Sequence, residues 1–155
     1  MVVYISMANH RERMVTSAAL LIRERGARPT AIGDVLAHSG APRGSAYHYF
    51  PGGRSQLLSE AVDYAADFVA GAIGKADSAV AMLDVAMRFY RQGLLDSDYR
   101  AGCPVMAVAV EAGDPDTTNT APVHRAAAAF ARWNDLIAAR LVADGVSRKK
   151  DCAPC

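Results

Sequence analysis

The stretch TAIGDVLAHSGAPRGSAYHYFPGGRSQLL, residues 30–58, contains two short helical patterns separated by a glycine turn and followed by a longer helical pattern. Ile32, Val35 and Leu36 recur at the spacing of one helix face, so a helix that begins after Thr30 would bury this face. The Thr30 hydroxyl can accept from free amides of the first turn, and we expect it to act as the N-cap. This region predicts the first half of a two-helix unit.

The second half follows a turn at Gly40, which can adopt the left-handed conformation that ends a helix. In residues 43–50, Ala46 and Phe50 share one helix face and are expected to pack inward. The outward positions carry Arg43, Ser45, Tyr47, His48 and Tyr49. Gly44 weakens the helix by about 1 kcal/mol relative to Ala, but it lets another backbone approach. Two short helices joined by a Gly-containing turn form a helix-turn-helix, whose second helix enters the major groove of DNA.

The same residues resemble the DNA-binding domain of the TetR family of bacterial transcriptional repressors. The matching positions keep one register: Gly26, Thr30, Ile32, Ala37, Gly40, Arg43, Gly44, Ser45, Tyr47, His48, Tyr49, Phe50, Arg54 and Leu57. A later segment, Gly102-Cys103-Pro104-Val105, is similar to one found in the LmrA/YxaF-like branch. The chain departs from the family at Pro42, where many relatives have Ser or Thr, and at Arg54, where most have Lys.

The resemblance implies a set of DNA-contacting residues around the second short helix. The side chains expected to bind phosphates are Thr30, Tyr47, His48 and Arg54. The residues expected to face base edges or to let the groove approach are Arg43, Gly44 and Ser45, and Tyr49 completes the set. Hydroxyl, imidazole and guanidinium groups supply the donors that phosphates and base edges accept. A cation at Arg54, beside free amides at the start of the next helix, would form a phosphate clamp.

Charge is distributed unevenly along the chain, although the net charge is only +1. Residues 1–54 hold seven Arg against three acidic residues, whereas the remainder holds ten basic and thirteen acidic residues. A basic N-terminal third fits DNA contact at one end of the molecule.

Helical periodicity continues to residue 143 and predicts an all-α chain, and 52% hydrophobic content with 21% charged residues favours a packed globule. Further helices are expected over about 9–25, 54–73, 78–95, 102–112 and 122–143. The segment 78–95 is apolar nearly all round, so we expect it to be buried on several sides.

The expected organisation comprises four segments: a disordered N-terminus (1–8), a helix-turn-helix DNA-binding domain (9–54), a helical regulatory and ligand-binding domain (55–145) and a disordered tail (146–155). Either Met1 or Met7 could be the true start. The resemblance implies a homodimer, but the usual dimerisation helices are missing after residue 145, so we expect the dimer to be weakened.

Met and aromatic side chains of the regulatory domain predict an apolar pocket between helices, although each of them could equally be core. The expected lining residues are Tyr64, Phe68, Phe89, Cys103, Met106, Val110, Phe130 and Trp133. The family resemblance implies a small inducer there, and we expect an uncharged or aromatic compound.

Other functional classes find little support. There is no Gly-rich phosphate loop, metal-ligand cluster or nucleophile elbow, so we expect no catalytic residue, metal or cofactor. The Cys152 to Cys155 spacing lacks the further ligands of a zinc site and the strand and helix of a thioredoxin-like site. No apolar run is long enough to cross a membrane, and three Cys without a secretory signal favour the cytoplasm.

Together these features predict a ligand-responsive transcriptional regulator, a repressor that a small inducer releases from double-stranded DNA with a pseudo-palindromic operator. Two alternatives stay open. One is a small helical ligand-binding or interaction protein without tight DNA binding. The other is an enzyme on a helical scaffold, which a catalytic constellation in the pocket would support.

Overall fold

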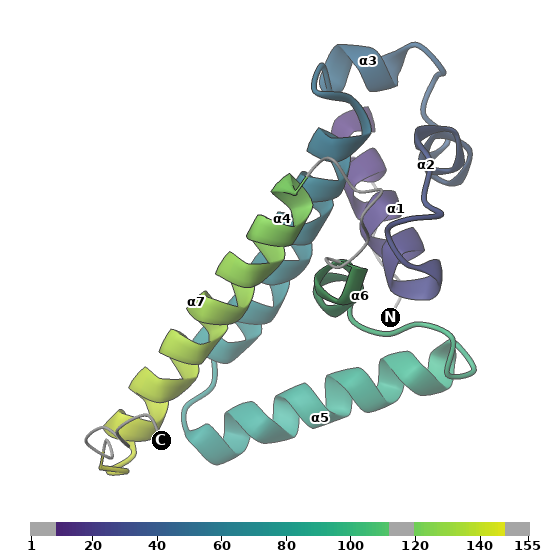
Figure 1. Cartoon of the computed structure of the whole chain (residues 1–155). Helices are drawn as coiled ribbons and strands as arrows, with labels where there is room; N and C mark the ends of the chain where they lie inside the picture. Colours follow the sequence, from purple (N-terminus) through teal and green to yellow (C-terminus); the bar gives the residue numbers. More distant parts are fainter. Residues whose placement is uncertain (1–8, 112–119, 148–155) are drawn as a thin grey trace.

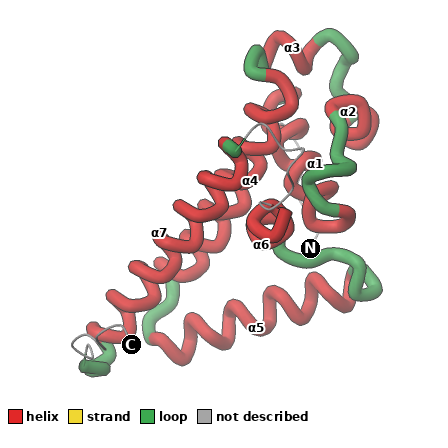
Figure 2. Tube along the Cα trace, viewed as in Figure 1, coloured by secondary structure: helices red, strands yellow, loops and turns green. Residues whose placement is uncertain are grey.

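The computed structural model describes residues 9–111 and 120–147, and most of these residues are in helices (Figure 1). They are α1 (His10–Arg25), α2 (Ile32–Ser39), α3 (Ser45–Tyr49), α4 (Gly53–Gly74), α5 (Ala79–Asp96), α6 (Pro104–Val110) and α7 (Ala121–Ala143). Figure 2 shows these helices joined by loops, with no strand in the described ranges. The all-α prediction is confirmed.

The turn between α2 and α3 forms as predicted, because Gly40 ends α2 with φ 66° and ψ 19°. The start of α2 differs from the prediction that Thr30 is its N-cap. Ala31 occupies the cap position, and its amide donates to the Asp34 carboxylate at 3.0 Å. Thr30 instead donates its hydroxyl to the Gly26 carbonyl at 2.8 Å. The N-cap prediction is wrong because Asp34, three residues into the helix, satisfies the free amide.

The main core lies where α4 packs against α1 on one side and against α7 on the other. Figure 1 shows α4 and α7 running side by side, with α1 beside the first half of α4. Trp133 of α7 donates its buried indole N–H to the Ala66 carbonyl of α4 at 3.1 Å. The largest fully buried side chains include Phe50, Met14, Ile22, Leu57 and Val62. This core fixes the helix-turn-helix to the long α4–α7 pair.

Helix α5 contradicts the prediction of a helix buried on several sides. Met82 is its one buried residue, whereas Val80, Leu83 and Met87 are 72%, 62% and 63% exposed. In Figure 1, α5 runs from the far end of α4 back toward α1, across the open side of the angle that they form. The described chain therefore offers α5 a packing surface on one side only.

Some of the predictions concern residues that the structure does not describe. The N-terminal segment 1–8 and the Cys152 to Cys155 motif lie outside them, and the division into domains stays a prediction. None of the helices in the described ranges combines the length and the hydropathy that a membrane span requires.

Candidate functional site

Helix α3 and the turn before it present a surface to solvent at one end of the molecule (Figure 1). Ala46 and Phe50 are buried, which confirms that they anchor this helix. Tyr47 is 73% exposed. The other exposed residues of this surface are Arg43, Gly44 and His48, whereas Ser45 and Tyr49 are half-buried. The structure therefore brings most of the predicted DNA-contacting residues onto one accessible surface, which we call the α3 surface.

Several contacts fix the α3 surface relative to α1 and α4. The Arg11 guanidinium of α1 lies 5.5 Å from the centre of the Phe50 ring and pairs with Glu60 of α4 at 2.6 Å. The Ser45 hydroxyl donates to the Pro42 carbonyl at 2.6 Å, within the turn that opens α3. A cation over an aromatic face adds attraction to the apolar packing of the ring. These contacts therefore fix the position of α3 relative to α1 and α4.

Two of the predicted phosphate contacts, Thr30 and Arg54, form hydrogen bonds within the protein. Thr30 is 1% exposed and its hydroxyl is bonded to the Gly26 carbonyl, so we remove it from the expected DNA contacts. Arg54 donates from Nε to the Thr30 carbonyl at 2.8 Å and from Nη2 to the carbonyls of Ala27 and Arg28. This guanidinium fastens the α1–α2 connection to the start of α4, because those carbonyls have no helical partner.

The expected phosphate clamp at the start of α4 is also partly occupied. The Gly52 amide donates to the Gln56 side chain at 2.8 Å, so that amide is not free for an anion. A phosphate at this position would compete with bonds that already satisfy both Arg54 and Gly52. The clamp is therefore weaker than the sequence alone suggests.

A carboxylate at the end of α6 ties the same connection to the other half of the molecule. Glu111 accepts from the amides of Ala27 and Arg28 at 2.9 and 2.8 Å. A Cβ at Gly26 would lie 2.4 Å from Glu111 Oε1, so glycine leaves room for this carboxylate. Before α6, the Gly102 amide donates to the Arg23 carbonyl at 2.8 Å. Helix α6 is thus attached to the helix-turn-helix at both ends.

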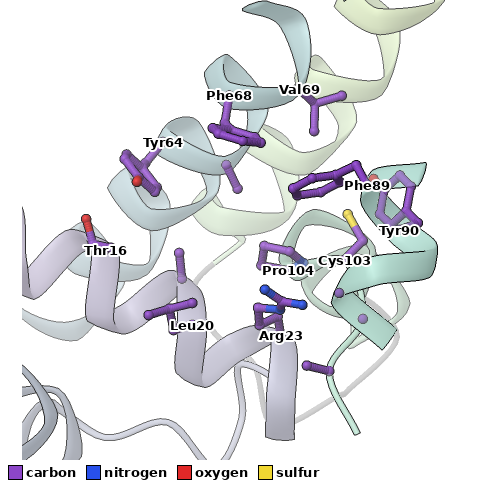
Figure 3. Close-up of a pocket in the computed structure, with 15 residues that line it drawn as sticks. Thr16, Leu20, Arg23, Tyr64, Phe68, Val69, Phe89, Tyr90, Cys103 and Pro104 are labelled. Atoms are coloured by element: carbon purple, nitrogen blue, oxygen red, sulfur yellow. The ribbon is translucent and has the colours of Figure 1, made fainter. Parts of the chain in front are cut away.

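An apolar pocket of about 100 Å³, partly open to solvent, lies between α1, α4, α5 and the start of α6 (Figure 3). Phe68 of α4 and Phe89 of α5 meet across it, with ring centroids 5.2 Å apart. Burial, together with a hydrogen bond to Cys103, raises the pKa of Tyr90 above its ordinary value. The Tyr90 phenol therefore stays neutral, so the pocket offers polar hydrogen-bonding groups without negative charge.

The predicted ligand-binding residues divide between this pocket and a second cavity beside it. Those that line the pocket of Figure 3 are Tyr64, Phe68, Phe89 and Cys103. Those that line the second cavity, between α6 and α7, are Cys103, Met106, Phe130 and Trp133. Val110 is among the lining residues of neither and is exposed at the end of α6. The eight residues expected to share one pocket are thus divided between two cavities, and Val110 lines neither.

Sequence reasoning missed the contribution of α1 to the pocket. Thr16, Leu20 and Arg23 line it, at the i, i+4, i+7 spacing of a second face of α1. That spacing could have identified the face, but the sequence prediction placed Arg23 on the solvent side and did not consider Thr16 or Leu20. The Glu111 contact also went unnoticed, because its partners lie more than 80 residues away in the chain.

Comparisons with known proteins give a consistent result. The protein-family model described as "Transcriptional regulator LmrA/YxaF-like, C-terminal domain" matches residues 79–153. An uncharacterised helix-turn-helix (HTH)-type transcriptional regulator of Mycobacterium tuberculosis is 64% identical over 142 residues, which cover 90% of this chain and 73% of the relative.

Two solved structures are similar to the whole described fold. The regulatory protein TetR from Rhodobacter sphaeroides matches with a TM-score of 0.71 and 20% identity, over 93% of this chain and 79% of that one. A TetR transcriptional regulator from Chloroflexus aurantiacus matches with a TM-score of 0.65 and 28% identity, over 92% and 73%. The first of these likenesses concerns the fold alone.

Proposed function

The chain belongs to the TetR family of HTH-type transcriptional regulators, in its LmrA/YxaF-like branch, and we propose that it is a repressor that a small ligand releases from DNA. Its family consists of regulators and not of enzymes. The observation that carries the proposal is the α3 surface, where Tyr47 and Arg43 are exposed on a helix anchored by the buried Phe50. The proposed action on DNA places the protein in the cytoplasm.

In this proposal α3 enters the major groove of double-stranded DNA. Arg43, Gly44 and Ser45 lie toward base edges, and Tyr47 and His48 contact phosphates. A homodimer would place two copies of α3 in successive major grooves of a pseudo-palindromic operator, about 34–36 Å apart. The packing of the Phe50 ring against the Arg11 guanidinium supports the proposal, because a dimer can match this spacing only if α3 is held rigidly.

Release by ligand would use the attachments of α6. Gly102, Cys103 and Pro104 at its start belong to the pocket wall, and Glu111 just after its end holds the amides of Ala27 and Arg28. A ligand that prefers a different position of α6 would therefore bias the position of the helix-turn-helix. The shift in population is limited by the difference in ligand affinity between the two states.

The DNA part of the proposal is tested by fluorescence anisotropy of a labelled pool of random duplexes at several salt concentrations. Arg43→Ala should weaken binding, and because Arg43 is assigned to base edges rather than to phosphates, the salt slope should fall by less than the one ion that a phosphate contact contributes. Tyr47→Ala should weaken binding with little change in slope, because the phenol carries no charge. Arg88→Ala changes an exposed arginine of α5, a helix that lies away from α3 in Figure 1; it is the control and should bind as the parent does. Unchanged binding by both α3 variants would overturn the assignment of the α3 surface.

A further inference from the structure

We propose that the ligand of the pocket in Figure 3 is an amphipathic anion, an aromatic ring system that bears one carboxylate, and that Arg23 of α1 binds its charge. The inference rests on the proposed function, in which this pocket takes a small ligand. It refines the expectation of an uncharged or aromatic compound, because it keeps the aromatic part and adds one negative charge.

Arg23 is the one charged side chain among the described residues that line the pocket. Its Nε atom is buried and donates no hydrogen bond within the described part of the chain. No carboxylate of the described residues pairs with its guanidinium. A buried donor without an acceptor is unfavourable, and an anion that accepts from Nε would remove this cost.

The surroundings keep Arg23 close to the pocket rather than in open solvent. A Cβ at Gly93 would lie 2.9 Å from Arg23 Nη2, so α5 approaches the guanidinium closely where it has no side chain. Figure 3 shows Arg23 beside Pro104, across the pocket from Phe68. Arg23 also lines a neighbouring surface cavity together with the acidic residues Glu24 and Asp96, neither of which lines the pocket of Figure 3.

The rest of the pocket suits the other part of such a ligand. The rings of Tyr64, Phe68 and Phe89 offer faces and edges for an aromatic ring. Tyr90 and Cys103 add a hydroxyl and a thiol, which can donate hydrogen bonds. An apolar cavity with a few convergent polar groups and one cation is typical of a site for an amphipathic acid.

Because Arg23 belongs to α1, the ligand's charge would act directly on the helix-turn-helix. The Arg23 carbonyl also accepts from the Gly102 amide, which links it to the start of α6. The same residue therefore touches the pocket, the helix that supports α3 and the loop that leads into α6.

The test uses matched probe pairs of increasing size: benzoate, 2-naphthoate and biphenyl-4-carboxylate, each with its primary amide. Binding to the full chain is measured by isothermal titration calorimetry. At least one carboxylate should bind about ten-fold more tightly than its amide, since a hydrogen bond to a charged group contributes at least this factor. Arg23→Gln should remove the preference and leave amide binding unchanged, and Arg23→Lys should restore part of it. Arg88→Gln, on the exposed side of α5, is the matched control and should keep the full preference.

The outcomes separate this inference from the proposed function. If carboxylate and amide bind equally well, or if Arg23→Gln weakens both equally, the inference is wrong while ligand binding in the pocket stands. If no probe binds to the folded parent chain, the pocket is not a site for small aromatic ligands, and both proposals on it fall. Circular dichroism of Arg23→Gln and Arg23→Lys checks that each variant is folded. If Arg23→Gln is unfolded, the comparison of each acid with its amide on the parent chain decides.

Discussion

Helices α4 and α5 are both long and rich in apolar residues, yet they lie in opposite environments. Helix α4 buries eight residues, because α1 and α7 cover two of its sides, whereas α5 buries Met82 alone. Glu60, Asp63 and Asp67 form a polar side on α4, so the sequence defines which face is buried. Helix α5 also has a polar side, formed by Asp84, Arg88, Arg91 and Gln92, yet it stays sparsely buried because the described chain covers little of its apolar side. An amphipathic pattern therefore predicts which face of a helix can be buried, but not whether another segment covers that face.

The same comparison bears on function, because the pocket lies between these two helices. One wall, formed by α1 and α4, is part of the main core, and the other is the sparsely buried α5. Segments with few buried apolar contacts open at low free-energy cost. We therefore expect the α5 wall to adapt to a ligand while the α1–α4 wall keeps its shape.

The largest expected effect is a difference in unfolding free energy between two matched leucines. Leu57 of α4 is 1% exposed, and Leu57→Ala should lower the free energy of unfolding by about 2–5 kcal/mol. Leu83 of α5 is largely exposed, and Leu83→Ala should change it by at most about 0.5 kcal/mol. Urea denaturation measures both. A loss at Leu83 as large as that at Leu57 would mean that α5 is packed in solution in a way that this structure does not show.

A smaller effect is expected where α6 joins the pocket to the helix-turn-helix. Glu111→Ala leaves the amides of Ala27 and Arg28 without their acceptor and should cost about 1–3 kcal/mol of unfolding free energy. Glu111→Gln keeps one acceptor oxygen and should cost less unfolding free energy.

The Glu111→Ala variant also tests whether the Glu111 contact transmits the ligand signal. If it does, Glu111→Ala should also reduce the effect of a bound carboxylate probe on DNA affinity, measured by anisotropy. An unchanged ligand effect in a folded Glu111→Ala variant would exclude this route.

The smallest effect is expected on the polar side of α4. Burial raises the pKa of Asp63, Arg125 opposes this shift at 3.3 Å, and Asp67 and Glu60 add to it. A raised pKa in the folded state means that the ionised carboxylate costs stability at neutral pH, and that this cost disappears as the pH falls below the ordinary value of 3.8. Asp63→Asn should therefore raise stability at pH 7 slightly, by less than about 0.5 kcal/mol because the group is half-exposed. A melting temperature lowered at pH 7 would show that the Arg125 pair outweighs burial.

Local chemistry explains what could be predicted from the sequence. The left-handed turn at Gly40 and the inward packing of Ala46 and Phe50 depend on neighbours within a few residues, and both are confirmed. The Thr30 cap was predicted wrongly because the Thr30 hydroxyl bonds back to the Gly26 carbonyl, so that Ala31 takes the cap position and Asp34 accepts from the Ala31 amide.

What the sequence could not reveal depends on contacts between distant segments. The charged residue of the pocket, Arg23, comes from α1, and its surroundings come from α5 and the start of α6, about 70 to 80 residues later. Arg54 was expected to bind phosphate, but the carbonyls that it bonds became visible only in the folded chain. The exposure of α5 likewise depends on where α1 and α4 lie.

Selection from a library of random double-stranded DNA, followed by sequencing of the bound fraction, tests the central claim most directly. The account predicts enrichment of a two-fold symmetric site whose half-sites lie one helical turn apart, about 10–10.5 base pairs from centre to centre. It also predicts that an Arg43→Ala/Tyr47→Ala variant loses this enrichment while an Arg88→Ala variant keeps it. No enriched sequence, or the same sequence enriched by the α3 variant, would contradict the account.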